Sequence, residues 1–109
     1  MVLCDLDAEK LKDKTEKFGI GRTSPSLDEL CQSDVDAIAI FTQHHMHGPQ
    51  AVQAMRSGKH VYSAVPSAIS VEEITELVRV TRETRKIYMV GESSYYYPCA
   101  IYCLSLIHI

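Results

Sequence analysis

The feature that most constrains this fold is a series of short apolar runs separated by helical segments. Residues 36–41 read DAIAIF, which is apolar without alternating polar positions. Such a run predicts a strand that is covered on both faces, as in a parallel sheet. Similar runs follow at 60–63 and 87–90, and another stands at 2–4. Strands that alternate with helices at this spacing predict an α/β fold with a doubly wound parallel sheet, right-handed crossovers and helices on both faces.

Capping residues predict where the helices begin and end. Asp and Ser side chains accept hydrogen bonds from the amides of the first helical turn, and Gly commonly follows the last turn. The predicted N-caps are Asp7, Ser26 and Ser70, which begin helices over 7–18, 27–32 and 70–84. In a further helix, Pro49 fits the first position and Gly58 ends it. The first helix ends at Gly19, and its residues Ala8, Leu11 and Phe18 share one apolar face.

Composition indicates one globular domain. The chain has 109 residues, of which 46% are hydrophobic and 23% are charged, as is ordinary for a protein with a single core. Its formal charge of -3 comes from 11 basic and 14 acidic side chains spread along the chain, so we expect neither a nucleic-acid nor a membrane partner. The four cysteines fit no zinc spacing, and we expect reduced thiols in a cytoplasmic protein.

Polar residues follow the carboxyl ends of the predicted strands, where an open parallel sheet binds its ligands. These ends carry Asp5, residues 42–48, residues 63–66 and residues 91–97. In a dinucleotide-binding fold, an acid after the second strand accepts hydrogen bonds from the adenosine ribose and disfavours a 2′-phosphate. Asp5 therefore suits NAD better than NADP, although an acid that only begins a helix explains it equally well.

The polar turn after the DAIAIF strand contains three histidines. His44 and His47 could reach one metal ion, but no Cys or carboxylate completes a ligand set nearby, so we expect no metal. The lining of a ligand cleft or a helix cap suits these histidines better, and an imidazole can also act as a general acid or base. After the last strand, Glu92 and Tyr95 begin a polar, Tyr-rich stretch that suits either sugar contacts or packing against another domain.

These residues together resemble the Gfo/Idh/MocA family, the glucose-fructose oxidoreductase and inositol dehydrogenase group, over about residues 2–98. Where the family reads D-x-D after its second strand, the chain reads DLD at 5–7. Where the family reads D-A-V-x-I-A-T-P-N-x-x-H, the chain reads DAIAIFTQHHMH at 36–47, so that Thr42 and His47 match.

The chain departs from the family pattern at two places. Gln43 and His44 replace the family's Pro and Asn. The family's A-G-K-H-V-x-x-E-K-P appears as SGKHVYSAVP at 57–66, so Ala64 and Val65 stand where the family has its Glu-Lys pair. A valine can neither donate a proton nor hydrogen-bond a substrate oxygen. The usual chemistry is therefore altered, moved to other groups such as the histidines, or lost.

The resemblance implies a domain organisation. Residues 1–98 would form part of an NAD(P)-binding Rossmann domain that lacks the first strand and phosphate loop, because no G-x-G-x-x-G is present. Residues 99–109 would be the start of the next element or a non-native tail. In the family, a second domain binds the substrate and builds the oligomer, so the full-length protein would be a homo-oligomer.

The resemblance also implies a function, namely NAD(P)-dependent hydride transfer at a hydroxyl carbon of a sugar, cyclitol or similar polyol. This 109-residue fragment alone would be inactive. The implied cofactor is NAD, with NADP disfavoured, and its ligands would be Asp5, Thr42, Gln43, His44, His47, Ala64, Val65 and Pro66. His47 is the catalytic candidate, and Glu92 and Tyr95 are the substrate candidates. Two alternatives remain open: a non-catalytic cofactor- or sugar-binding homologue, and a small metal-dependent hydrolase that uses His44 and His47.

Overall fold

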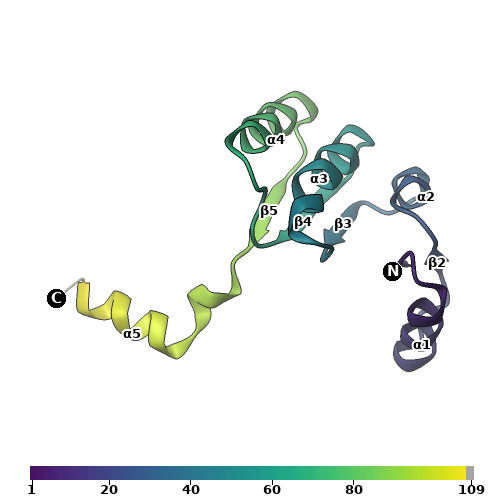
Figure 1. Cartoon of the computed structure of the whole chain (residues 1–109), viewed down its shortest axis with the longest axis horizontal. Coiled ribbons are helices and arrows are strands. Elements are labelled where there is room, and N and C mark those ends of the chain that lie inside the picture. Colours follow the sequence, from purple (N-terminus) through teal and green to yellow (C-terminus); the bar gives the residue numbers. More distant parts are fainter. Residues whose placement is uncertain (108–109) are drawn as a thin grey trace.

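The computed structural model describes residues 1–107, in which strands and helices alternate (Figure 1). The strands are β1 (Leu3–Cys4), β2 (Thr23–Ser24), β3 (Ala37–Ile40), β4 (His60–Ala64) and β5 (Tyr88–Gly91). The α-helices are α1 (Ala8–Phe18), α2 (Leu27–Gln32), α3 (His47–Arg56), α4 (Val71–Thr84) and α5 (Pro98–Ile107). Two 3-10 turns are η1 (His44–Met46) and η2 (Ser93–Tyr96). None of the helices described here is both long and apolar enough to cross a membrane.

The strands form two parallel sheets. One pairs β1 with β2, and the other has the order β3-β4-β5. The predicted α/β fold with parallel strands is confirmed, but the prediction of one continuous sheet is wrong for the described residues. The sequence also gave no sign of β2, because Thr23 and Ser24 are polar residues within a predicted turn. Ser24 is nevertheless buried.

Strand β3 is covered on one face only. Its side chains alternate between exposed and buried, with Ile38 and Ile40 in the core and Ala37 and Ala39 exposed. The prediction that this run is covered on both faces is therefore wrong. Small alanines at every second position make an apolar run that conceals the two-residue period of a half-covered strand.

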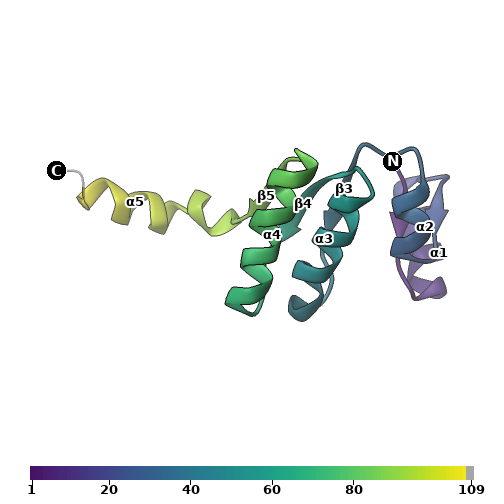
Figure 2. The same cartoon turned by 90° about the horizontal axis from the view of Figure 1, so that it is seen from above.

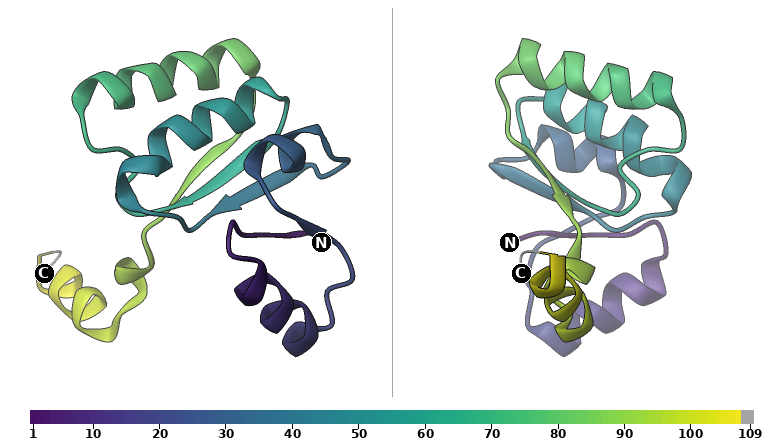
Figure 3. Two further views of the ribbon diagram at one scale, coloured as in Figure 1. Left: turned by 45° about the vertical axis from the view of Figure 1, so that its right-hand side comes forward. Right: turned by 90° about the vertical axis from the view of Figure 1, so that its left-hand side faces the viewer.

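Helices α3 and α4 lie side by side over one face of the β3-β4-β5 sheet, while α1 lies on the opposite side of the molecule (Figures 2 and 3). The core is formed between this sheet, these two helices and α2. Its members are Leu30, Cys31, Ile38, Ile40, Ala51, Ala54, Met55, Val61, Leu77 and Val80. Helix α1 buries none of its residues: on its predicted apolar face, Ala8 and Phe18 are exposed and Leu11 is half-buried.

The predicted helix caps are confirmed. The side chains of Asp7, Ser26 and Ser70 accept hydrogen bonds from amides of the first turn, and Gly19 ends α1 in the left-handed conformation. The predicted start at Pro49 is wrong, because α3 begins two residues earlier. Pro49 still lies in the first turn, where a backbone N–H has no partner within the helix.

Helix α5 projects from the rest of the molecule (Figure 1), and none of its residues is buried. It contains residues 99–107 of the stretch 99–109, for which the sequence predicted either the start of the next element or a non-native tail. Residues 108 and 109 lie outside the described part of the chain. The division of the chain at residue 98 stays a prediction.

Candidate functional site

The parallel register of β3, β4 and β5 brings their carboxyl ends to one edge of the sheet. Ile40 pairs with Ser63, and Ala64 pairs with Gly91. The residues that follow these strands, 41–43, 65–66 and 92, therefore leave the sheet at the same edge. This is the edge at which open α/β folds bind ligands.

His47 joins two of these strand ends. Its side chain is 1% exposed. Ring atom Nδ1 lies 2.7 Å from the carbonyl oxygen of Pro66, and Nε2 lies 3.0 Å from the carbonyl oxygen of Thr42. The structure thus brings together three predicted site residues from the turns after β3 and β4. Because both ring nitrogens are engaged inside the protein, His47 has no free nitrogen with which to exchange a substrate proton.

The other residues of the polar turn face outward. Gln43 and His44 are exposed, and the His44 ring meets the His47 ring edge-on with 5.8 Å between centroids. The Thr42 hydroxyl donates to Oε1 of Gln50 over 2.6 Å. Within residues 1–107, no three His, Cys, Asp or Glu side chains are grouped so as to hold a metal ion. The metal-dependent hydrolase hypothesis therefore finds no ligand set in the described part of the chain.

The turn after β4 offers mainly backbone groups. The Ser63 side chain is fully buried and donates to the carbonyl oxygen of Ala64 over 3.0 Å. Val65 is 40% exposed, and the Val65–Pro66 peptide bond is cis. No side chain in residues 64–66 carries a proton for transfer.

Asp5 lies apart from this edge, after β1 in the two-stranded sheet. It is exposed, and its Oδ1 accepts a hydrogen bond of 2.9 Å from the amide of Asp7, the N-cap of α1. Hydrogen bonds from the amides of Lys10 and Glu9 lower the pKa of the Asp7 carboxyl. Asp5 thus helps to begin α1 while its side chain remains open to a ligand, and both interpretations of this residue fit its geometry.

Glu92 and Tyr95 follow β5. Oε1 of Glu92 accepts a hydrogen bond of 2.8 Å from the Ser94 amide, and hydrogen bonds from the Ser94 side chain and amide lower the pKa of the Glu92 carboxyl. The Tyr95 ring packs edge-on against Tyr96, with 5.4 Å between centroids. Glu92 therefore caps η2, and Tyr95 lies exposed beside it.

Glu73 of α4 lies beside the first turn of α3 and was not among the predicted site residues. Oε2 of Glu73 accepts a hydrogen bond of 3.0 Å from the Ile69 amide, and a Cβ added to Gly48 would meet it at 3.0 Å. The spacing of Ser70 and Glu73 is typical of a capping box, in which the Glu side chain turns back to the helix start, but it does not indicate a contact with α3. A carboxylate beside a helix N-terminus is favourable, and it leaves that terminus less room for a ligand phosphate.

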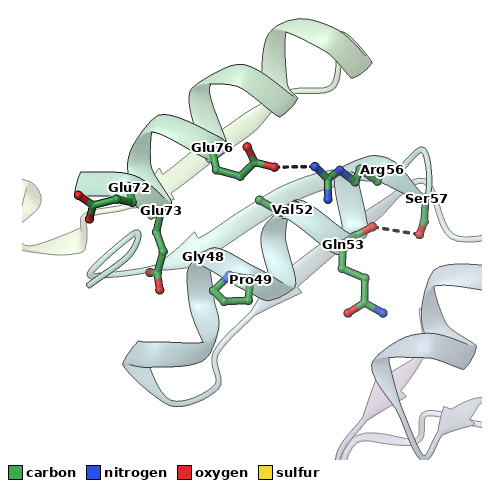
Figure 4. Close-up of a pocket in the computed structure, with 9 residues that line it drawn as sticks. All are labelled: Gly48, Pro49, Val52, Gln53, Arg56, Ser57, Glu72, Glu73 and Glu76. Carbon is green, nitrogen blue, oxygen red and sulfur yellow. Dashed lines mark hydrogen bonds and ion pairs between the residues drawn. The ribbon is translucent and has the colours of Figure 1, made fainter. Parts of the chain in front are cut away.

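A groove of about 680 Å³ runs between α3 and α4 on the outer side of the helices (Figure 4). An ion pair of 2.5 Å between Arg56 and Glu76 crosses it. The groove is lined by Gly48, Pro49, Val52, Gln53, Arg56, Ser57, Glu72, Glu73 and Glu76. It belongs to the packing of the two helices, and the exposed residues after β3 and β4 are not part of its lining.

Parallel strands whose carboxyl ends meet at one edge of an α/β sheet are typical of nucleotide-binding Rossmann domains. Residues 1–92 match the oxidoreductase family with an NAD-binding Rossmann fold, GFO_IDH_MocA. The chain belongs to this Gfo/Idh/MocA family of oxidoreductases. The predicted family membership and fold class are thereby confirmed.

Individual relatives agree with this assignment. The chain is 33% identical over 92 residues to a 4-carboxy-2-hydroxymuconate-6-semialdehyde dehydrogenase from Sphingobium, covering 84% of this chain and 29% of the relative. It is 38% identical over 88 residues to an alpha-N-acetylgalactosaminidase from Bacteroides fragilis, covering 79% of this chain and 21% of the relative. The structure of scyllo-inositol dehydrogenase from Lactobacillus casei with NAD(H) and scyllo-inositol superimposes with a TM-score of 0.87 at 21% identity, covering 99% of this chain and 32% of that one.

Proposed function

We propose that this chain is the cofactor-binding part of an NAD-dependent oxidoreductase that transfers hydride at a hydroxyl carbon of a sugar, cyclitol or similar polyol. The observation that carries the proposal is the meeting of Thr42 and Pro66 at one sheet edge through His47. In a chain of this family, that edge is the place for the nicotinamide. The chain spans less than a third of the relatives it matches, so the activity of the whole protein is part of the proposal.

The described residues fit two parts of NAD. The exposed Asp5 carboxylate suits the ribose of the adenosine half and disfavours a 2′-phosphate, which supports NAD over NADP. The nicotinamide half would pass between the turn at 42–44 and the turn at 64–66. When bound, NAD supplies the group that accepts or returns the hydride.

The pyrophosphate needs a site elsewhere. The α3 N-terminus already has the Glu73 carboxylate beside it. Among the described strands, β1 pairs only with β2, and β3 pairs only with β4, so each has a free edge. We place a further parallel strand between β1 and β3. A G-x-G-x-x-G loop would follow this strand, and the N-terminus of the next helix would hold the pyrophosphate.

Proton transfer requires a group other than residue 65. Ala64 and Val65 contribute backbone contacts only. His44 is an exposed imidazole at this edge, 5.8 Å from the His47 ring, and we assign it the acid or base role that the family gives to a Lys. Glu92 and Tyr95 remain the proposed substrate contacts. The family resemblance also supports a homo-oligomeric, cytoplasmic full-length protein.

A second candidate is an NAD-dependent glycoside hydrolase. The observation that favours it is the 38% identity to an alpha-N-acetylgalactosaminidase over 79% of this chain, together with the loss of the Glu-Lys pair at Ala64 and Val65. NAD-dependent glycosidases are a known exception to the two-carboxylate mechanism. A third candidate is a non-catalytic homologue that binds a cofactor or sugar.

One assay separates the three. The full-length protein is incubated with NAD⁺ and a panel of polyols and sugars while the absorbance of reduced nicotinamide is followed. Dehydrogenation gives reduced nicotinamide in proportion to substrate consumed, and His44→Ala lowers the rate. Release of N-acetylgalactosamine from a glycoside without net reduction of NAD⁺ indicates the hydrolase. Cofactor binding without either product indicates the non-catalytic homologue and contradicts the main proposal.

A further inference from the structure

Helix α3 contacts both polar groups of Thr42, which lies in the turn after β3. His47 and Gln50 are three residues apart, so their side chains project from the same face of this helix. Nε2 of His47 lies 3.0 Å from the Thr42 carbonyl oxygen, and the Thr42 hydroxyl donates to Oε1 of Gln50 over 2.6 Å. Gln50 is half-buried, whereas Thr42 is exposed at the edge of the sheet where ligands bind.

The direction of the hydrogen bond between Thr42 and Gln50 determines what Thr42 can offer to a ligand. A threonine hydroxyl has one O–H and two lone pairs. The bond length of 2.6 Å lies within the usual range for an O–H···O hydrogen bond. Because the single proton points to Gln50, only lone pairs of Oγ1 remain for a further partner. The exposed hydroxyl of Thr42 is therefore a hydrogen-bond acceptor.

Other acceptors at this edge already have partners inside the protein. The carbonyl oxygens of Thr42 and Pro66 lie against the two nitrogens of His47, and the Ala64 carbonyl accepts from the Ser63 hydroxyl. Within residues 1–107, no side chain or amide donates to Oγ1 of Thr42. Its lone pairs thus remain available to a ligand that enters between the two turns.

We propose that Gln50 is a positioning residue that makes Thr42 an acceptor for a hydrogen-bond donor on the nicotinamide half of NAD. Two groups of that half are donors, namely the carboxamide nitrogen and the ribose hydroxyls. A ligand that presents only acceptors to Thr42 would meet a lone pair and bind less tightly. The inference rests on the proposed cofactor function for the identity of the ligand, whereas the bond between Gln50 and Thr42 does not depend on it.

The first experiment needs no cofactor. Urea unfolding of the full-length protein is measured for Thr42→Val, which removes the hydroxyl, for Gln50→Met, which removes its acceptor, and for the double variant. The double variant should lose less stability than the sum of the two single losses, because either change alone already removes the shared bond. The control is Gln53→Met with Thr42→Val, which should be additive, since the Gln53 amide donates to Asp28 instead. Additive losses at Gln50 would overturn the proposal whether or not the protein binds NAD⁺.

The second experiment identifies the donor on the ligand. Calorimetry on the full-length protein compares the Kd of NAD⁺ with that of its acetylpyridine analogue, which has a methyl group in place of the carboxamide nitrogen and keeps the ribose hydroxyls. If the donor is the carboxamide, NAD⁺ should bind about three- to tenfold more tightly, as one neutral hydrogen bond allows. This ratio should approach one in Gln50→Met, where the freed hydroxyl can turn and donate to the acetyl oxygen. If the donor is a ribose hydroxyl, both dinucleotides should bind alike, and Gln50→Met should weaken both by a similar factor.

Gln50→Glu separates the direction of the hydrogen bond from simple packing. A carboxylate can only accept, so it keeps the Thr42 proton in place, and its charge acts alike on the two dinucleotides. We expect the wild-type ratio of Kd values in Gln50→Glu and unchanged Kd values in the control Gln53→Met. An unchanged NAD⁺ Kd in Gln50→Met, or an altered ratio in Gln50→Glu, would overturn the role of Gln50. If the wild-type protein binds neither dinucleotide, the proposed cofactor function and this ligand are both contradicted, while the unfolding experiment still tests the hydrogen bond itself.

Discussion

Helices α1 and α3 have nearly the same length, 11 and 10 residues, and both carry an apolar face, but the structure uses them differently. Helix α3 buries five residues, including Ala51, Ala54 and Met55, against β3, β4 and α4. Helix α1 buries none, and beside it stands a sheet of only two short strands. An apolar stripe in the sequence predicts which face of a helix can be buried. Whether that face is buried depends on the elements that pack beside the helix.

This difference also divides the proposed cofactor site. The β3-β4-β5 region holds the proposed nicotinamide walls on a packed core. The β1-β2-α1 region holds Asp5 on a surface that is largely exposed. We therefore expect changes in the first region to reduce stability, and changes in the second to affect stability little.

The largest contrast is expected between the two helices. Met55→Ala removes a side chain that is 0% exposed, so it should destabilise the protein by about 2–5 kcal/mol through lost burial and a cavity. Phe18→Ala on α1 removes a side chain that is 63% exposed and should change stability by less than about 0.5 kcal/mol. Urea unfolding of both variants measures the difference. Equal losses would contradict the division into a packed and an exposed region.

A smaller contrast concerns two glycines. A Cβ on Gly91 would lie 2.2 Å from the Tyr62 hydroxyl oxygen and 2.3 Å from its Cζ, so Gly91→Ala must displace the ring. We expect a loss of about 1–3 kcal/mol, partly recovered in the double variant with Tyr62→Val. Gly21→Ala, which meets nothing within 4 Å, is the matched control. Thermal unfolding measures the stability of these variants. A Gly91→Ala variant with an unchanged Tm would show that the Tyr62 ring moves aside without cost.

The cap of α4 should contribute less. The Ser70 side chain accepts a hydrogen bond of 3.2 Å from the Glu73 amide. Ser70→Ala leaves that amide without this partner and should cost about 1 kcal/mol, whereas Ser70→Thr keeps the hydroxyl and most of the stability. Unfolding curves of the two variants give the comparison. The same loss in both would mean that the cap is not what holds this helix end.

The smallest effect is expected at the ion pair between Arg22 and Asp34, which joins the two regions on the surface. Hydrogen bonding and charge attraction from Arg22 lower the pKa of the Asp34 carboxyl. A lowered folded-state pKa gives stability that is present above the unfolded value of about 4 and is lost as the pH falls through the folded value. Arg22→Gln should thus lower Tm slightly at neutral pH and not in strong acid. A Tm difference that grows on acidification would contradict the pair.

Much of the fold could be predicted because its signals are local. The caps at Asp7, Ser26 and Ser70 and the left-handed end at Gly19 depend on a few neighbouring residues. Strand β2 could not be predicted, because two polar residues become a strand only by pairing with β1.

The candidate site likewise has a part that could be predicted from local sequence and a part that depends on tertiary contacts. The sequence placed Thr42, His47 and Pro66 at strand ends. It could not show that the His47 ring is buried between the two carbonyls, since that depends on the register of β3 with β4. The carboxylate of Glu73 beside α3 is likewise a tertiary contact between two helices.

The central claim is that these residues form the ribose and nicotinamide parts of an NAD site whose pyrophosphate part lies on a strand and loop outside them. Calorimetric titration with NAD⁺ of the 109-residue chain and of the full-length protein tests it most directly. The account predicts a Kd weaker than about 1 mM for the chain and at least about a hundredfold tighter for the full-length protein. Submillimolar binding by the 109-residue chain alone would contradict it.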